Sequence, residues 1–353
     1  MKKHRAKTKI ICTLGPSSSE ESVIREMMMA GMDVCRINFS HGSHRQHAGY
    51  ADTIRKLNIK YRRKVRLLAD LEGARMRIGL LPGHKPLPLK KNQSLYLSCG
   101  PDFQENTVHF DYHGNLSDIE PARFIYIDDG NITLEITGIE KSRIRTRVLS
   151  GSLLKERKGI NIPGAKLNFP LLNEKDMKDI DFAVSEGFDY IAQSFVTRKE
   201  NISALKEYAR AGKKLKIAAK IENQEGIDNI DEIMDVSDMI MIARGDLGIS
   251  IPVYRVPFVQ KELISRCREA GKKSITATQM LESMTENPFP TRAEVSDVAN
   301  AVVDGSDYVM LSAETSVGRY PVDCVRMMNE IIKYSEIYTA IPGHRNRHIQ
   351  VLK

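Results

Sequence analysis

The sequence contains no tryptophan, and aromatic side chains make up only 6% of its 353 residues. Proteins that bind single-stranded nucleic acids stack the bases on aromatic side chains set among basic residues, and the sequence has no such motif. The net charge of +8 therefore does not indicate a nucleic-acid partner, and we expect the basic clusters at 1–7 and 61–64 to be solvated surface. A basic balance also suits proteins that handle small phosphorylated anions.

Long apolar segments are missing as well. No run approaches the roughly 20 residues that a membrane-spanning helix needs, and the N-terminus lacks the apolar region of a signal peptide. The five cysteines are an odd number and have no metal-ligand spacing, which favours free thiols in a reducing compartment. We therefore expect a cytoplasmic globular protein without a membrane partner.

Strands and helices alternate along the first 72 residues. Apolar runs at 8–16, 33–40 and 66–72 predict strands, and helical patterns lie between them, the first closed by Gly31 and the second reaching Tyr61. This order implies parallel strands joined by right-handed crossovers. From Gly73 to Pro163 the sequence has no convincing helix and many period-two segments, among them 124–136, where Asp129-Gly130 predicts a hairpin.

The alternation resumes after Pro163, where a helix over 173–187 is expected, with Asn173 as its N-cap and Gly187 at its end. Five further strands are predicted at 190–195, 216–222, 239–243, 274–279 and 308–314. Helices are predicted at 199–211, 229–236, 257–270, 291–303 and 320–335.

The total of eight strand–helix pairs in about 260 residues predicts an α/β fold, the (β/α)8 TIM barrel. Residues 1–72 and 164–340 would form the barrel, 73–163 an all-β lid inserted after the third strand, and 341–353 a basic tail. An open doubly wound sheet is the alternative, but the glycine signature that it carries after its first strand is missing.

Ionisable residues follow two neighbouring apolar runs, 216–226 and 239–248. Lys220 and Glu222 are two residues apart and so share one face of a strand, while Asp246 lies in a glycine-rich segment, 244–248, that reads as a turn. One cation and two carboxylates at adjacent strand ends suit Mg²⁺ or Mn²⁺ beside an anionic substrate. The alternative is a buried Lys–Glu ion pair capped by the N-terminus of a helix.

Other polar residues fall at predicted strand ends, where a TIM barrel carries its chemistry: Arg36, Asn38, Ser40, Asp70, Glu72, Thr278, Ser312 and Glu314. Lys220 and Arg36 supply fixed positive charge for a phosphoryl group in transfer. Asn38, Ser40 and Asp70 add oxygen ligands for a second cation, although Asn38 and Ser40 could instead cap a helix. Histidine is scarce and cysteine absent at these ends, which argues against zinc hydrolysis.

Nine segments in this order resemble the pyruvate kinase family: IICTLGPSS, CRINFSHG, DDGNI, KGINIPG, AKIENQEG, IMIARGDLG, ATQMLESM, NPFPTRAEVSDVANAVVDGSD and MLSAET. The resemblance extends to about Ser335. It implies a barrel with a mobile β-barrel lid and transfer of a phosphoryl group from phosphoenolpyruvate to ADP, giving pyruvate and ATP in glycolysis.

The resemblance also implies roles for single residues. Lys220 would stabilise the transferring phosphoryl group, Glu222 and Asp246 would bind Mg²⁺, and Arg36 would contact the phosphate. Gly245 and Asp246 match the start of a helix that receives the substrate carboxylate, and Thr278 matches a threonine that relays a proton to the enolate. Asn38, Ser40, Asp70 and Leu71 match a K⁺ site, and Arg77, Lys158, Asn38 and His41 match the nucleotide side.

Departures from the family pattern cluster at 69–77, which reads ADLEGARMR where the family usually reads LDTKGPEIR. Glu72 replaces a lysine, Leu71 a threonine and Arg75 a glutamate, and Val317 replaces a second lysine farther along. Relatives that act without K⁺ carry lysine at the place of Arg75, so we predict activity without K⁺, with the guanidinium of Arg75 in place of the ion.

The family's C-terminal domain is expected to be absent, together with activation through it, and a homodimer through the barrel stays open. Two alternatives stay open as well: a relative that acts on another enol phosphate, and a catalytically silent homologue that binds a nucleotide.

Overall fold

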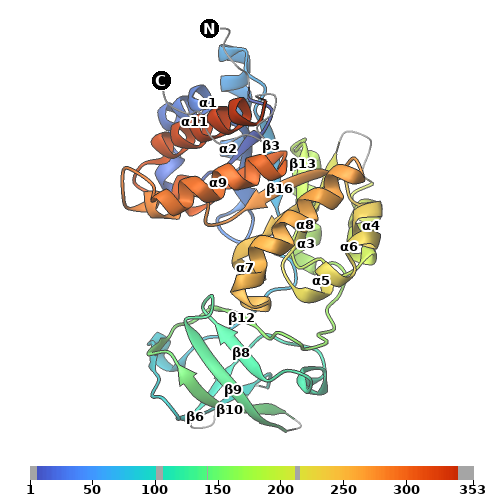
Figure 1. The fold of residues 1–353 in the computed structure, drawn as a ribbon. Helices are drawn as coiled ribbons and strands as arrows, with labels where there is room; N and C mark the ends of the chain where they lie inside the picture. The colour runs from blue at the N-terminus through green and yellow to red at the C-terminus, as the bar shows by residue number, and fades with distance from the viewer. Residues whose placement is uncertain (1–5, 101–105, 141, 211–214, 341–353) are drawn as a thin grey trace.

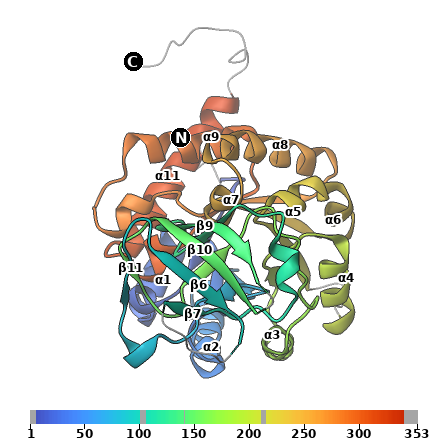
Figure 2. The same ribbon diagram turned by 90° about the horizontal axis from the view of Figure 1, so that it is seen from below.

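The computed structural model describes residues 6–100, 106–140, 142–210 and 215–340. The predicted basic tail at 341–353 lies outside these residues. The described chain forms a barrel ringed by helices, with a separate all-β part beside one end of it (Figure 1). Seen from that end, the all-β part lies in front of the barrel, and the helices of the barrel are visible around its outline (Figure 2).

Eight parallel strands of the described chain close into the barrel, in the order β1-β17-β16-β15-β14-β13-β3-β2. The last strand pairs with the first, with Lys9 opposite Tyr308. The strands are β1 (Lys9–Thr13), β2 (Met32–Asn38), β3 (Arg66–Asp70), β13 (Tyr190–Gln193), β14 (Lys216–Ile221), β15 (Met239–Ala243), β16 (Lys273–Ala277) and β17 (Tyr308–Leu311). The predicted α/β fold, with its eight-stranded barrel, is confirmed.

Helices cover the outside of the barrel and bury the outward-facing apolar residues of the strands. They are α1 (Glu21–Ala30), α2 (His44–Tyr61), α3 (Glu174–Ser185), α4 (Lys199–Tyr208), α5 (Gln224–Asp228), α6 (Ile230–Val236), α7 (Arg244–Ser250), α8 (Val256–Glu269), α9 (Arg292–Asp304), α10 (Ala313–Ser316) and α11 (Pro321–Ala340). Inside the barrel, inward-facing residues such as Ile11, Leu68 and Met241 form a second apolar cluster. The barrel is therefore a packed core with an open end, as its period-two strands require.

The helix ends follow the local signals of the sequence. The side chain of Asn173 accepts a hydrogen bond from the Asp176 N–H at 2.7 Å, so the predicted N-cap of α3 is confirmed. Gly31 follows α1 with φ 135° and Gly187 follows α3 with φ 63°, a backbone region that favours glycine. Ser43 caps α2 through the Gln46 N–H, so the reading of Asn38 and Ser40 as helix caps is wrong.

The segment between β3 and β13 forms a seven-stranded sheet, which we call the lid, with the order β4-β12-β8-β9-β10-β6-β7. A bridge between Ile78 and Phe110 joins the two edges of this sheet, so it rolls up around an apolar cluster of its own. The strands are β4 (Met76–Arg77), β12 (Gly159–Asn161), β8 (Phe124–Ile127), β9 (Ile132–Ile139), β10 (Arg143–Ser150), β6 (Ser94–Ser98) and β7 (Thr107–His109), with a separate pair, β5 (Leu87–Pro88) and β11 (Leu153–Leu154).

The hairpin between β8 and β9 turns through residues 128–131, where Asp128, Asp129 and Gly130 all have positive φ. Strand β12 brings the chain back to the barrel and packs beside α7 (Figure 1). The lid therefore meets the barrel where α7 follows the end of β15. Among the described residues, no helix combines the length and the hydropathy needed to cross a membrane.

Candidate active site

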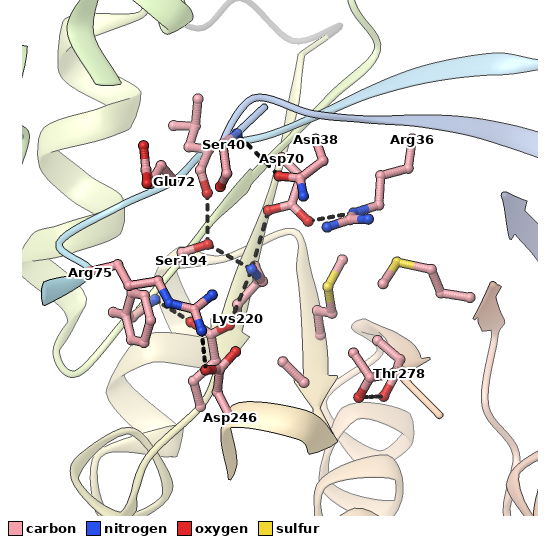
Figure 3. A pocket seen from close by; sticks show the side chains of 17 residues that line it. Arg36, Asn38, Ser40, Asp70, Glu72, Arg75, Ser194, Lys220, Asp246 and Thr278 are labelled. Atoms are coloured by element: carbon pink, nitrogen blue, oxygen red, sulfur yellow. Dashed lines mark hydrogen bonds and ion pairs between the residues drawn. The ribbon is translucent and has the colours of Figure 1, made fainter. Parts of the chain in front are cut away.

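A cavity of about 100 Å³ lies where the barrel strands end on the side of the lid (Figure 3). Its floor consists of inward-facing apolar residues of the barrel, and its walls are mostly charged or polar. The lining residues are Arg36, Asn38, Ser40, Asp70, Leu71, Glu72, Arg75, Ser194, Phe195, Lys220, Glu222, Met241, Ala243, Asp246, Ala277, Thr278 and Met310. Parallel strands place their carboxyl ends on one rim, and this explains why residues so far apart in sequence converge here.

Lys220 reaches into the cavity from β14 and has three partners. Its Nζ lies 3.2 Å from an Asp70 oxygen and 3.1 Å from a Glu222 oxygen, and it donates a hydrogen bond to Ser194 Oγ at 2.6 Å. Burial alone would lower the pKa of Lys220, but the carboxylates of Asp70 and Glu222 outweigh it and raise the pKa. Lys220 is therefore a fixed, buried cation (Figure 3).

Arg36 adds a second cation from β2. Its Nε donates to Asp70 at 2.6 Å and its Nη1 donates to Thr13 Oγ1 at 2.8 Å. Burial would raise the pKa of Asp70, but Lys220 and Arg36 lower it, so Asp70 is an anion shared by two cations. One carboxylate thus positions both of the cations that are predicted to meet a phosphoryl group.

Glu222 and Asp246 offer oxygen ligands for a divalent cation. Burial raises the pKa of Glu222 to about 7. The positive charge of Lys220 lowers this pKa, and the negative charge of Asp246 raises it. Asp246 Oδ1 is buried and has no hydrogen-bond partner. No group of three or more His, Cys, Asp and Glu side chains that could hold a metal occurs in the described part of the chain. Two carboxylates suit Mg²⁺ or Mn²⁺, which keep several positions for water and substrate oxygens.

Asp246 lies in the first turn of α7, so the turn predicted over 244–248 is wrong, whereas the helix start that the resemblance implies at Gly245 and Asp246 is present. This correction has a physical reason in the neighbouring strand. The N-cap residue, Ala243, has no capping side chain, and the Gly245 N–H instead donates to Thr278 Oγ1 at 2.8 Å. A side chain from the end of β16 thus satisfies a free N–H group at the start of the helix, a partner that sequence spacing does not reveal.

Thr278 has φ 69° and Gln279 has φ 52°, although β-branched residues rarely adopt this region. Such strain costs about 1–3 kcal/mol and persists only where the surroundings impose it. Arg244 imposes it here: its guanidinium donates to the Thr278 carbonyl oxygen at 2.6 Å and to that of Gln279 at 3.1 Å, and pairs with Asp297 at 2.7 Å. The hydroxyl of Thr278 is thereby held at the cavity wall.

Arg75 crosses from the segment after β3 to two carboxylates. Its Nη2 lies 3.5 Å from Asp246 Oδ1 and 3.2 Å from Asp129 in the hairpin turn of the lid. Arg75 Nε is buried without a hydrogen-bond partner. The guanidinium therefore places positive charge beside the predicted metal ligand and bridges the barrel to the lid.

The cavity is lined by all four residues predicted for a K⁺ site, which are Asn38, Ser40, Asp70 and Leu71. Asn38 Oδ1 accepts a hydrogen bond from the Ser40 N–H at 3.2 Å, and the Leu71 carbonyl oxygen accepts one from Ser194 Oγ at 2.7 Å. Whether a monovalent ion binds there stays a prediction.

Three of the predicted nucleotide contacts lie outside the cavity lining, at the junction of lid and barrel. Arg77 pairs with Glu72 at 2.6 Å, and Lys158 pairs with Asp128 at 2.6 Å. Burial and then the nearby guanidinium of Arg77 lower the pKa of His41, which places His41 beside Arg77. These residues lie at one edge of the site. Arg77 and Lys158 are each paired with a carboxylate of the chain itself.

A larger cleft of about 720 Å³ adjoins the cavity and shares Arg75, Ser194, Phe195 and Glu222 with it. One wall is the segment that leaves the lid after β12, and the other consists of the loops after β13 and β14. Clefts of this size between two parts of a protein accommodate small organic ligands. Glu222, one of the two predicted metal ligands, therefore lines both the cavity and the cleft.

Sequence reasoning missed two residues of this site. Ser194 directly follows β13, so its place at a strand end was the signal that could have identified it. Arg244 was read only as part of a turn. Its partners Asp297, Gln260 and Thr278 are 16 to 53 residues away in sequence, so no local pattern pointed to it.

Comparison with known proteins agrees with the family resemblance of the sequence. Residues 5–325 match the family model described as pyruvate kinase, barrel domain. Similar curated proteins include the pyruvate kinases of Sporosarcina psychrophila (44% identity, 97% of this chain and 59% of the relative), Geobacillus stearothermophilus (44%, 94% and 57%) and Staphylococcus aureus strain MRSA252 (43%, 94% and 57%). The chain thus spans less than two thirds of the length of these relatives. With its barrel, its cavity and this match over most of its length, the chain belongs to the pyruvate kinase family.

Proposed function

We propose that the protein is a pyruvate kinase, which transfers the phosphoryl group of phosphoenolpyruvate to ADP and yields pyruvate and ATP. The observation that carries the proposal is the set of contacts around Lys220, which is held by Asp70, Glu222 and Ser194 beside Asp246. Phosphoryl transfer depends mostly on positioning and on electrostatic stabilisation of the moving group. Two fixed cations next to two metal-binding carboxylates meet this requirement.

The side chains would divide the work. Arg36 would bind a phosphate oxygen of the substrate, and Lys220 would stabilise the phosphoryl group during transfer. Glu222 and Asp246 would hold Mg²⁺, which when bound neutralises phosphate oxygens. The Gly245 and Asp246 end of α7 would orient the substrate carboxylate. Thr278, whose hydroxyl now donates to the Ala277 carbonyl oxygen at 2.6 Å, would relay the proton that the enolate receives.

The nucleotide would bind at the edge of the site next to the lid, with its phosphates near Arg77 and Lys158 and with Asn38 and His41 on the same side. Residues 73–163 would act as a lid that closes over both substrates and excludes water. Arg75 would supply the positive charge that K⁺ supplies in other members of the family. The proposal places the reaction in the cytoplasm, as part of glycolysis.

A homodimer through the barrel accords with exposed apolar side chains at Val253 and Tyr254, in the 3₁₀ turn before α8, and at Phe258, in the first turn of α8. A second copy that packs against this face would remove the patch from water. Sedimentation of the full chain tests this, and a monomer at micromolar concentration would contradict it.

The test of the proposed activity is a coupled assay of the full chain with phosphoenolpyruvate, ADP and Mg²⁺, in which pyruvate is measured. Lys220→Met should abolish the turnover. Lys261→Met is the matched control, because Lys261 is a surface lysine of α8 that pairs with Asp304 at 2.7 Å. Absence of turnover together with measurable Mg-ADP binding would overturn the proposal and indicate a silent nucleotide-binding homologue.

A further inference from the structure

The two basic residues predicted to contact the nucleotide phosphates are both bound to carboxylates of the chain itself. Arg77 lies on β4 at the entrance of the lid, and Lys158 lies just before β12 at its exit. Arg77 pairs with Glu72, and Lys158 pairs with Asp128. A phosphate that binds either cation therefore competes with a carboxylate of the chain.

The pair between Arg77 and Glu72 is the stronger of the two. One oxygen of Glu72 accepts from Arg77 Nε at 2.9 Å and from Nη2 at 2.6 Å. Arg77 Nη1 donates to the Arg157 carbonyl oxygen at 3.1 Å, so all three nitrogens of the guanidinium have partners. The side chains of Glu72 and Arg77 are 18% and 25% exposed. Ion pairs that are partly shielded from water are screened less than surface pairs.

Glu72 also has an alternative partner. Its second oxygen lies 3.6 Å from Lys175 Nζ, on α3, and Lys175 further pairs with Asp179 at 2.7 Å. Glu72 can therefore leave Arg77 without becoming an isolated charge, because Lys175 is already within reach. The arrangement permits an exchange in which Arg77 passes to a phosphate and Glu72 passes to Lys175.

We propose that Glu72 determines the affinity for the nucleoside diphosphate by competing with its phosphates for Arg77. This inference rests on the proposed function for the identity of the ligand. Glu72 acts through the guanidinium of Arg77, which donates two hydrogen bonds to one Glu72 oxygen where a phosphate oxygen would otherwise accept them. The pair between Lys158 and Asp128 is a weaker counterpart, because Lys158 is more exposed than Arg77 and makes one contact with its carboxylate where Arg77 makes two.

The test is calorimetric titration of the full chain with ADP, in the absence of phosphoenolpyruvate. Glu72→Gln keeps the shape of the side chain and removes its charge, and the dissociation constant for ADP should fall about fivefold, which corresponds to about 1 kcal/mol. Glu135→Gln is the matched control. Glu135 is also 18% exposed and pairs with an arginine of the lid, Arg147, away from the predicted nucleotide residues. This variant should bind ADP like the wild type.

A double variant tests whether the effect passes through Arg77. In an Arg77→Met background, Glu72→Gln should no longer tighten ADP binding, because the guanidinium for which Glu72 and the phosphates compete is no longer present. Glu72→Asp shortens the side chain and keeps the charge. It should give a dissociation constant between those of the wild type and Glu72→Gln, and it replaces Glu72→Gln if that variant does not fold.

The outcomes separate this inference from the proposed function. Tighter ADP binding in Glu72→Gln that disappears with Arg77→Met supports the inference, even if the protein does not turn over phosphoenolpyruvate. Unchanged or weaker ADP binding in Glu72→Gln overturns it, even if the wild type is an active kinase. A gain that persists in the Arg77→Met background also overturns it.

Discussion

Two groups of charged residues lie within one site and are held in different ways. The inner cluster, which consists of Arg36, Asp70, Lys220 and Glu222, sits at the ends of the barrel strands with side chains at most 12% exposed. The rim pairs, Glu72–Arg77, Asp128–Lys158 and Asp129–Arg75, lie at the edge of the lid next to the barrel and include side chains up to 70% exposed. In the inner cluster Asp70 and Lys220 each have several charged partners, while the rim carboxylates mostly pair with one cation.

This difference separates fixed charge from exchangeable charge. A buried charge without a partner costs several kcal/mol, so the members of the inner cluster hold one another in place. An exposed pair contributes about 0–1 kcal/mol, so a ligand can displace one of its members. The inner cluster therefore suits transition-state stabilisation, which needs preorganised groups. The rim pairs suit binding and release of a nucleotide.

The largest expected difference between the two groups is in stability. Asp70→Asn leaves Arg36 and Lys220 without their shared anion and should lower the free energy of unfolding by about 3–5 kcal/mol. Asp128→Asn, in a rim pair, should lower it by less than about 0.5 kcal/mol. Urea unfolding of both variants measures the difference. Equal losses would remove the distinction between inner cluster and rim.

Arg244→Met tests whether the inner site depends on the strained loop at its edge. Arg244 fixes the carbonyl groups of Thr278 and Gln279, so its loss should displace the Thr278 hydroxyl and lower kcat about 10- to 100-fold. Arg266→Met serves as the control, because Arg266 is a surface arginine of α8 that pairs with Asp231 at 3.0 Å. A kcat equal to that of Arg266→Met would show that the loop does not need this support.

Asp176 is an intermediate case. It is buried like the inner cluster, and its carboxylate accepts a hydrogen bond from a loop amide, the Gly73 N–H, at 3.1 Å. Burial raises its pKa to about 6, with Lys175 lowering it and Asp179 and Glu72 raising it further. The folded protein thus holds the proton more tightly than the unfolded chain, and this contribution to stability is lost as the pH rises through about 6.

Asp176→Asn keeps the acceptor oxygen and removes the titration. Relative to the wild type, the variant should have nearly the same stability at pH 4 and be about 3 kcal/mol more stable at pH 8, as the size of the pKa shift implies. Thermal or urea unfolding across this range measures the change. A stability difference that does not depend on pH would mean that Asp176 does not titrate in this range.

The smallest expected effect is that of the monovalent cation. With Arg75 3.5 Å from Asp246, replacing K⁺ by Na⁺ or Tris should change the turnover by less than about threefold, below 1 kcal/mol in the barrier. Arg75→Glu removes the fixed charge and should make the turnover depend on K⁺. Strict K⁺ dependence of the wild type would rule out the role assigned to Arg75.

The sequence predicted most of the fold and the membership of the inner cluster, and the reason is geometric. Parallel strands end on one rim, so Arg36, Lys220, Glu222 and Asp246 had to converge once the eight strands were recognised. The ion pair of the alternative prediction is also present, because Lys220 Nζ and Glu222 Oε1 lie 3.1 Å apart. The pair faces a cavity, however, and is part of a larger network.

What the sequence could not predict are partners that depend on tertiary packing. The cap that Thr278 provides for α7 and the hold of Arg244 on residues 278–279 join segments about 33 residues apart through side-chain orientation alone. The pair between Glu72 and Arg77 likewise depends on how the first lid strand leaves the barrel. Local periodicity carries no information about such contacts.

The most direct test of the proposed reaction is phosphorus NMR of the full chain with phosphoenolpyruvate, ADP and Mg²⁺. The signal of phosphoenolpyruvate should disappear while the γ-phosphate signal of ATP grows in equal amount. In the proposed reaction Lys220, Arg36 and the two carboxylates predicted to bind the metal would stabilise a phosphoryl group that passes directly from phosphoenolpyruvate to ADP. Growth of inorganic phosphate instead, or a phosphoenolpyruvate signal that does not change, would contradict transfer at this site.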